Sequence, residues 1–115
     1  MTTAAFASGT QSATVTTEHF LSSPNEAGVY TLHVDLVNMA AGDYVEIRVY
    51  QMVLTAGTQR VVYLETYQGA QPTDGLIAVS VPIGNELTDT NSLRFSLKQT
   101  LGTSRNFPWK VLKYT

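Results

Sequence analysis

The sequence contains no cysteine, so neither a disulfide framework nor a thiolate metal site is possible. Charged residues are also scarce, at 14% of the chain against about 25% in ordinary soluble domains. No apolar run approaches the roughly 18 residues of a membrane span, and the first residues lack the basic start and apolar run of a signal peptide. These absences predict a protein that works outside the membrane and depends on packing or on neighbours for its stability.

Residues that favour β-strands replace the missing charge. The chain has 115 residues, the length of a single domain, and contains 16 threonines, 12 valines and 6 tyrosines. Branched and aromatic side chains of this kind suit a pleated, half-buried surface. The composition therefore predicts an all-β protein.

Apolar and polar residues alternate in several segments, as they do in strands with one buried face. The predicted strands cover 14–21, 29–37, 44–54, 58–67, 76–81, 92–101 and a last segment around 107–111. Their short connections predict an antiparallel β-sandwich, jelly-roll-like, with seven or eight strands in one domain over residues 18–115. Residues 1–17 carry no charge and little periodicity, so we expect an extended N-terminal arm with Phe6 as its one large anchor.

The hairpin over residues 44–67 is apolar on both faces. A three-residue loop at 55–57, with Gly57 at positive φ, would place Tyr50 opposite Val62. The core face would then hold Val45, Ile47, Val49, Val53, Val61, Tyr63 and Tyr67. The other face would hold Tyr44, Tyr50, Met52, Leu54, Val62 and Leu64. We expect this second face, together with Phe6, to contact a partner; the alternative is that another layer of the domain, such as the arm, covers it.

Candidates for chemistry are few. His33 and Asp35 share one face of a strand, but a metal site needs a third ligand and none has a recognisable spacing. The polar run at 85–91 lacks the pattern of a calcium loop, and no nucleotide-binding or nucleophile motif is present. The sequence therefore predicts no enzyme, no metal and no cofactor.

The charges are distributed unevenly along the chain. All nine acids lie between Glu18 and Asp89, where Arg48 and Arg60 are the only bases. Five bases follow with no further acid, namely Arg94, Lys98, Arg105, Lys110 and Lys113. The two groups could pair across one sheet or could steer a partner, but a net charge of −2 argues against nucleic-acid binding.

One part of the chain resembles a family of known proteins. The segments are VYTLHVDLVNMAAGDYVEIRVYQ and GTQRVVYLETYQGAQP, within residues 29–72. They are similar to a group of small, mostly uncharacterised virion structural proteins of tailed bacteriophages. The matching residues are Gly28, Val29, Tyr30, Asp35, Leu36, Ala40, Ala41, Gly42, Asp43, Ile47, Arg48, Tyr50, residues 57–62 and residues 69–71.

The resemblance implies a non-enzymatic virion protein, such as a capsid decoration or cement protein. Its partners would be the major capsid protein, other virion proteins or its own copies, with a trimer favoured. It would lie on the capsid surface after assembly in the host cytoplasm. The alternative is a carbohydrate or host-surface binding module of a head fibre, or a tail, neck or baseplate component.

Overall fold

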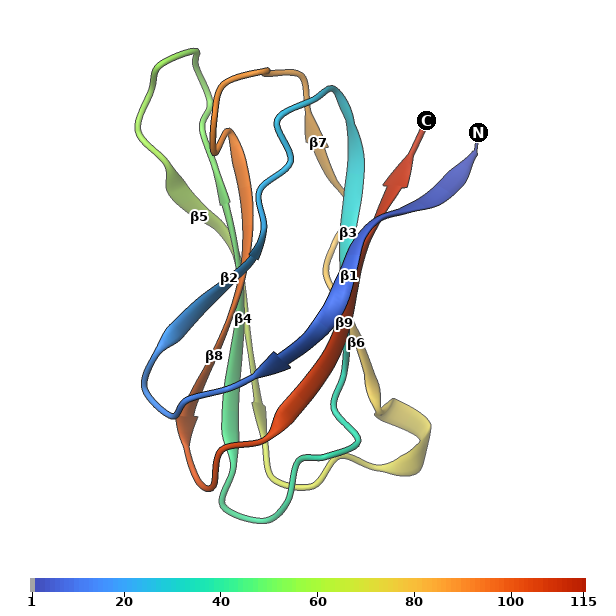
Figure 1. Cartoon of the computed structure of the whole chain (residues 1–115), viewed down its shortest axis with the longest axis vertical. Coiled ribbons are helices and arrows are strands. Elements are labelled where there is room, and N and C mark those ends of the chain that lie inside the picture. The colour runs from blue at the N-terminus through green and yellow to red at the C-terminus, as the bar shows by residue number, and fades with distance from the viewer. Residues whose placement is uncertain (1) are drawn as a thin grey trace.

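Alternating strands assemble into two antiparallel sheets in the computed structural model, which describes residues 2–115 (Figure 1). Sheet A has the order β1–β9–β3–β6, and β7 also pairs with β3; the strands are β1 (Thr3–Ser12), β9 (Asn106–Tyr114), β3 (Gly28–Asp35), β6 (Ile77–Val79) and β7 (Ile83–Asn85). Sheet B has the order β2–β8–β4–β5; its strands are β2 (Glu18–Ser22), β8 (Leu93–Leu101), β4 (Tyr44–Gln51) and β5 (Arg60–Gln68). The fold is the predicted β-sandwich.

The pairing is nested along the chain. β1 pairs with β9, β2 with β8, β3 with β6 and β7, and β4 with β5. A long antiparallel ribbon that folds over so that its successive strand pairs alternate between two sheets is a jelly roll. The jelly-roll-like prediction is confirmed in its strand order.

The core lies between the sheets and is made of the predicted inward residues. The side chains that are fully buried and largest include Tyr30, Leu32, Leu36, Leu93, Phe95, Leu97 and Phe107. On the hairpin, Val45, Ile47 and Val49 are buried, while Tyr63 and Tyr67 pack against them half-buried. Apolar burial of this kind contributes about 25 cal/mol per Å².

The expected N-terminal arm over residues 1–17 is wrong for the residues that the structure describes. Thr3–Ser12 form β1, which pairs with β9 along its whole length. The segment lacks alternation because its residues are small and mostly exposed at a sheet edge, so the sequence pattern carries no strand signal. Phe6 sits at a bulge in this strand. Residue 1 lies outside the described part.

Within residues 2–115 the strand count is nine, not seven or eight. The two strands that the sequence did not indicate are β1 and the three-residue β7. β6 and β7 lie in line beside β3, and Pro82 separates them, as its missing N–H requires. Ser80 bridges the break, since its Oγ accepts the Leu32 N–H at 2.9 Å.

A buried carboxylate fixes the turns at one end of the sandwich. Asp43 is 1% exposed and accepts hydrogen bonds from the N–H groups of Ala40 (2.9 Å) and Thr103 (3.2 Å) and from Arg105 Nε (2.8 Å). Gly102, at φ +97°, leaves room for it, because a Cβ there would meet the Asp43 side chain. The turn before β4 and the turn after β8 are therefore joined.

Candidate functional site

The β4–β5 hairpin carries a bulge that the sequence did not indicate. Up to Val49, which lies opposite Tyr63, the pairs follow the predicted register. Tyr50 then lies opposite Val61 and not Val62, because Val62 is an extra residue in β5. The bulge moves Val61 from the predicted core face to the outer face of sheet B, where it is 46% exposed.

The loop of the hairpin is also longer than predicted and covers residues 52–59. Positive φ falls on Ala56 and not on Gly57. A glycine is still required at 57, since a Cβ there would lie 2.7 Å from the Leu54 carbonyl oxygen. Val53, which was predicted to lie in the core, is 79% exposed in this loop.

Three of the residues predicted to contact a partner are exposed on this hairpin. Leu54 is 72% exposed, Leu64 52% and Val62 50%. Val53 and Val61 are exposed beside them. We call these five residues the hairpin patch. Exposed apolar side chains that are concentrated on one hairpin mark a candidate interaction site.

The other predicted contact residues are partly covered by the chain itself. Tyr44, Tyr50 and Met52 are half-buried on the hairpin. The ring of Phe6 packs edge-on against Tyr30 with centroids 5.4 Å apart, so Phe6 lies against the molecule's own core. Because β1 belongs to sheet A, the N-terminal segment does not cover the outer face of sheet B.

A hydrogen-bonded network crosses the outer face of sheet B below the hairpin patch. Glu18 of β2 accepts bonds from the hydroxyls of Tyr50 and Ser96, each at 2.6 Å. Arg48 pairs with Glu46 at 2.7 Å. Burial would raise the pKa of Glu18, but the bonds from Ser96 and Tyr50 and the charge of Arg48 together lower it. The carboxylate thus ties β2, β4 and β8 together.

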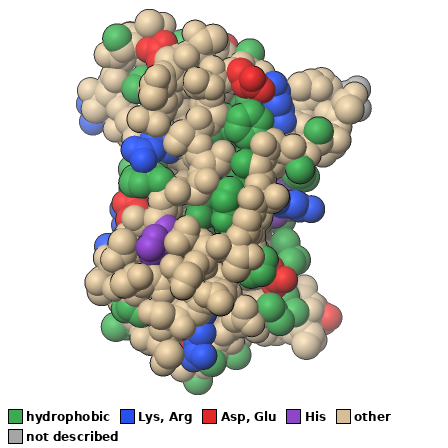
Figure 2. Space-filling view, viewed as in Figure 1, with side chains coloured by type: hydrophobic (Ala, Val, Ile, Leu, Met, Phe, Trp, Pro, Cys, Tyr) green, Lys and Arg blue, Asp and Glu red, His purple; other side chains and the backbone are tan. Residues whose placement is uncertain are grey.

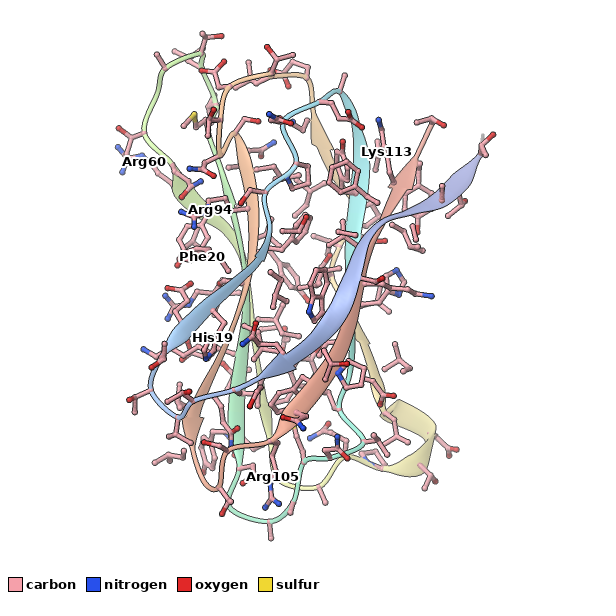
Figure 3. The ribbon with its side chains drawn as sticks, in the orientation of Figure 1. His19, Phe20, Arg60, Arg94, Arg105 and Lys113 are labelled. Carbon is pink, nitrogen blue, oxygen red and sulfur yellow. The ribbon has the colours of Figure 1, made fainter. Side chains whose placement is uncertain are left out.

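An aromatic and cationic pair lies next to this network. The guanidinium carbon of Arg94 is 3.4 Å from the ring centroid of Phe20, and the Phe20 and Tyr50 rings are 5.8 Å apart. Figure 3 shows Phe20 and Arg94 side by side, with Arg60 directed away from the sandwich. Within residues 2–115 the Nε of Arg94 is buried without a hydrogen-bond partner, so stacking and not hydrogen bonding at Nε positions this cation.

β5 forms one edge of sheet B. It pairs with β4 alone, and its last residue, Gln68, has its carbonyl capped by the Gln71 amide at 3.0 Å. In the part of the chain that the structure describes, the backbone groups over residues 60–67 that point away from β4 have no hydrogen-bond partner. Such an edge is a template for another strand.

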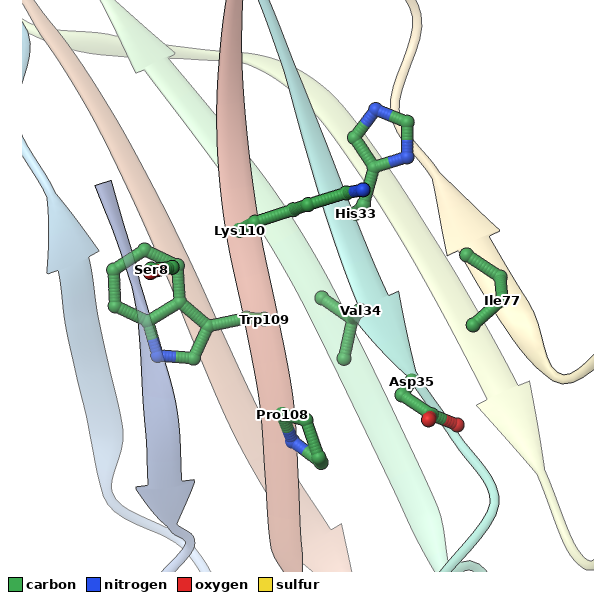
Figure 4. A pocket seen from close by; sticks show the side chains of 8 residues that line it. All are labelled: Ser8, His33, Val34, Asp35, Ile77, Pro108, Trp109 and Lys110. Atoms are coloured by element: carbon green, nitrogen blue, oxygen red, sulfur yellow. The ribbon is translucent and has the colours of Figure 1, made fainter. Parts of the chain in front are cut away.

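A second candidate site is a groove of about 340 Å³ on the outer face of sheet A (Figure 4). It is lined by residues from β1, β3, β6 and β9, namely Ser8, His33, Val34, Asp35, Ile77, Pro108, Trp109 and Lys110. Lys110 extends across β3 toward His33. Burial and the charge of Lys110 lower the pKa of His33 from its ordinary 6.5.

The described residues do not bring the side chains of a metal site together. No three His, Cys, Asp or Glu side chains of residues 2–115 are placed to hold a metal ion. In the run at 85–91, Asp89 accepts the Ala56 N–H at 2.6 Å, and the Asn85 amide donates to backbone carbonyls of Glu26 and Leu87. This polar run ties loops together.

The charged side chains are spread over the surface, and some of them form ion pairs. Figure 2 shows charged side chains of both signs scattered among uncharged ones on the face that carries β1 and β2. Across the described residues, ion pairs join Arg48 to Glu46, Arg105 to Asp43 and Lys113 to Glu26. Two of these three pairs join a C-terminal base to an earlier acid, but Glu26 and Asp43 both lie in loops, so neither is a cross-strand pair within one sheet of the kind considered from the sequence.

No family model, curated protein or solved structure matches this chain. The resemblance to phage virion proteins therefore stays a prediction. None of the described segments is a helix long and apolar enough to cross a membrane.

Sequence reasoning missed three residues of the outer face, namely Glu18, Phe20 and Arg94. Alternation within 14–21 could have placed Glu18 and Phe20 on one face of a strand. No local signal shows that β2 lies beside β8, which is 71 or more residues later and brings Arg94 onto the Phe20 ring.

Proposed function

We propose that this chain is a non-enzymatic structural protein of a bacteriophage particle, most of all a capsid decoration or cement protein. It binds the major capsid protein, or another virion protein, through the hairpin patch on the capsid surface, after assembly in the host cytoplasm. The observation that carries the proposal is the exposure of Val53, Leu54 and the β5 aliphatic residues in a domain whose core is already complete.

The composition of this surface supports a protein contact. The hairpin patch is apolar. The half-buried Tyr50 and Met52 lie where β4 enters the loop. Arg48 and Glu46 follow along β4, and Tyr44 lies at the far end of the strand. An apolar centre with aromatic and methionine side chains and a polar rim is the usual composition of a protein interface. The Arg48–Glu46 pair is already formed in the free chain, so the attraction between the two charges offsets part of their desolvation cost where a partner covers them.

The fold supports the proposal only by analogy. Jelly rolls occur in viral capsid proteins and also in lectins. A fold shared by unrelated functions does not choose between them, so the choice rests on the surface.

The test compares two double variants in co-sedimentation with empty capsid shells of the phage that encodes the chain. Val53→Ser with Leu54→Ser removes the most exposed apolar side chains of the loop and leaves both strands intact. We expect at least about tenfold weaker binding, because each buried aliphatic side chain contributes on the order of 1.5 kcal/mol or more. The matched control is Ile77→Ser with Val79→Ser on the outer face of sheet A, where both residues are about as exposed as those of β5.

Unchanged shell binding by the loop variant would contradict the proposal, and so would a native protein that does not bind shells. Circular dichroism and the unfolding midpoint establish that both variants fold.

A second candidate function, carbohydrate binding, is favoured by the groove of about 340 Å³ on sheet A. Its lining combines apolar Ile77 and Pro108 with hydrogen-bonding His33, Asp35 and Lys110, which is the mixture that ligand pockets use. A glycan array discriminates the two functions. Glycan binding that is lost in the Ile77 and Val79 variant and retained in the loop variant would replace the capsid proposal.

A further inference from the structure

The edge strands of the two sheets differ in length and in the features that keep them from pairing with another chain. β6 and β7 have three residues each, and β2 has five with a bulge and a charged Glu18. β1 has ten residues and a bulge at Phe6, and it carries no charged side chain. β5 has nine residues, no proline and no lysine, and its bulge at Val62 lies near one end. Short strands resist pairing with other chains, which leaves β1 and β5 as the long edges. Of these two, β5 alone carries charged side chains that can pair with those of a partner strand.

The order of side chains in β5 makes the strand complementary to itself. When the two residues at the bulge, Val61 and Val62, are counted as one position, Arg60 and Glu65 lie two positions on either side of Tyr63. A second copy running antiparallel about a twofold axis at Tyr63 would place Arg60 of each copy opposite Glu65 of the other. Leu64 would face the bulge valines, and the two Tyr63 rings would meet.

The two charges are free for such a contact. Arg60 and Glu65 are both exposed, and within the described residues neither is part of an ion pair. β5 therefore carries one unused positive and one unused negative charge, spaced so that a copy of the same strand satisfies both. A strand of an unrelated protein would pair with both charges only if it carried an acid and a base at the same spacing.

We infer that two copies of this chain pair through their β5 edges, antiparallel and about a twofold axis at Tyr63, to form a continuous eight-stranded sheet. The inference rests on the proposed function, because a structural protein repeated on a particle meets its own copies at high local concentration. One partner of the hairpin is then a second copy of the same chain.

The inner side of β5 has side-chain surface left for this pairing. Tyr63 and Tyr67 are only half-buried against the core. Pairing at the edge would cover the remaining exposed part of Tyr63. Eight strands lie within the usual size of an open twisted sheet, which rarely exceeds about ten.

Charge reversal with rescue tests the inference. Sedimentation velocity over a range of concentrations gives the dimer dissociation constant of the full chain. We expect Arg60→Glu alone and Glu65→Arg alone each to weaken the dimer by about tenfold or more, since each places like charges opposite one another. The double variant exchanges the charges and should restore dimerisation to within about threefold of the native chain.

Cysteine cross-linking tests the register, and the native chain has no cysteine to interfere. A mixture of Leu64→Cys and Val62→Cys chains should form disulfide-linked heterodimers on oxidation, more readily than either variant alone. The matched control is Val37→Cys, which is 52% exposed on a loop away from β5 and should not cross-link.

A chain that stays monomeric, a double variant that is not rescued, or a Leu64→Cys chain that cross-links best with itself would overturn the inference. A trimer in sedimentation, as expected from the sequence, would also overturn it. Shell binding by the charge-reversal variants separates the two proposals. Monomeric protein that still binds shells would contradict only the strand pairing. Dimeric protein that does not bind shells would contradict only the capsid function.

Discussion

At the scale of single residues, Asp43 shows how a buried charge stabilises the turns of this domain. Burial alone would raise the pKa of Asp43, but the bonds from Ala40, Arg105 and Thr103 outweigh it and lower the pKa from its ordinary 3.8. A carboxyl group whose pKa is lowered by folding stabilises the folded state above its unfolded pKa. That contribution is lost as the pH falls through the folded pKa.

We predict that Asp43→Asn lowers the free energy of unfolding at pH 7 by about 2–3 kcal/mol, because the Arg105 and backbone donors lose an ionised acceptor. Urea unfolding at pH 7 and at pH 3 measures this. The native chain should lose stability below about pH 4, and the variant should lose less over the same interval. Asp74→Asn, at an exposed position, is the control. An Asp43→Asn variant with the native acid profile would contradict this role.

At the scale of elements, the side chain of Glu18 helps to hold β2 in sheet B. The strand has five residues and a bulge, so its backbone ladder is short. Glu18 adds two bonds at 2.6 Å, to Tyr50 on β4 and to Ser96 on β8. The outer face of the sheet is therefore bonded across three strands, and Tyr50 contributes to stability as well as to the surface.

Glu18→Gln should loosen β2 while the rest of the sandwich stays folded. We expect a loss of about 1 kcal/mol in overall stability, since charge-assisted bonds become neutral ones. Amide hydrogen exchange should become faster in β2 and stay unchanged in β3. Glu86→Gln, at an exposed position, serves as the matched control. Equal protection of β2 in both variants would show that its backbone ladder alone holds the strand.

At the scale of the whole molecule, the two ends of the chain close the jelly roll together. Thr2 and Thr115 exchange backbone hydrogen bonds of 2.7 and 2.9 Å, and β1 continues this pairing along β9 (Figure 1). Ala13, which follows β1, is buried in the core. The N-terminal segment is thus a part of the sandwich.

Deletion of residues 2–12 should therefore destabilise the whole domain. We expect the free energy of unfolding to fall by more than about 2 kcal/mol, because a strand of backbone hydrogen bonds is lost and β9 becomes an edge. Urea unfolding followed by tryptophan fluorescence measures this, since Trp109 lies on β9. A free arm would instead leave the midpoint unchanged on deletion. Substitution of Val37, on an exposed loop, by Ser controls for general surface effects.

Much of the fold could be predicted from local patterns. Alternation in β3, β4 and β8 identified the buried faces correctly, as the burial of Leu32, Ile47 and Phe95 confirms. Alternation has a period of two residues, so it needs no knowledge of the strand's neighbours. The same reasoning placed Leu54, Val62 and Leu64 outside the core, and the structure confirms that they are exposed.

The sequence by itself determined the class of the protein: a cysteine-free, charge-poor β domain with the core faces of its main strands. Tertiary structure alone decided which strands are neighbours, and with them that β1 belongs to sheet A, that the Val62 bulge turns Val61 outward, and that Phe20 meets Arg94. The physical reason is one of range. Side-chain alternation is set by adjacent residues, whereas strand partners are chosen by hydrogen bonds and packing between segments far apart in the chain.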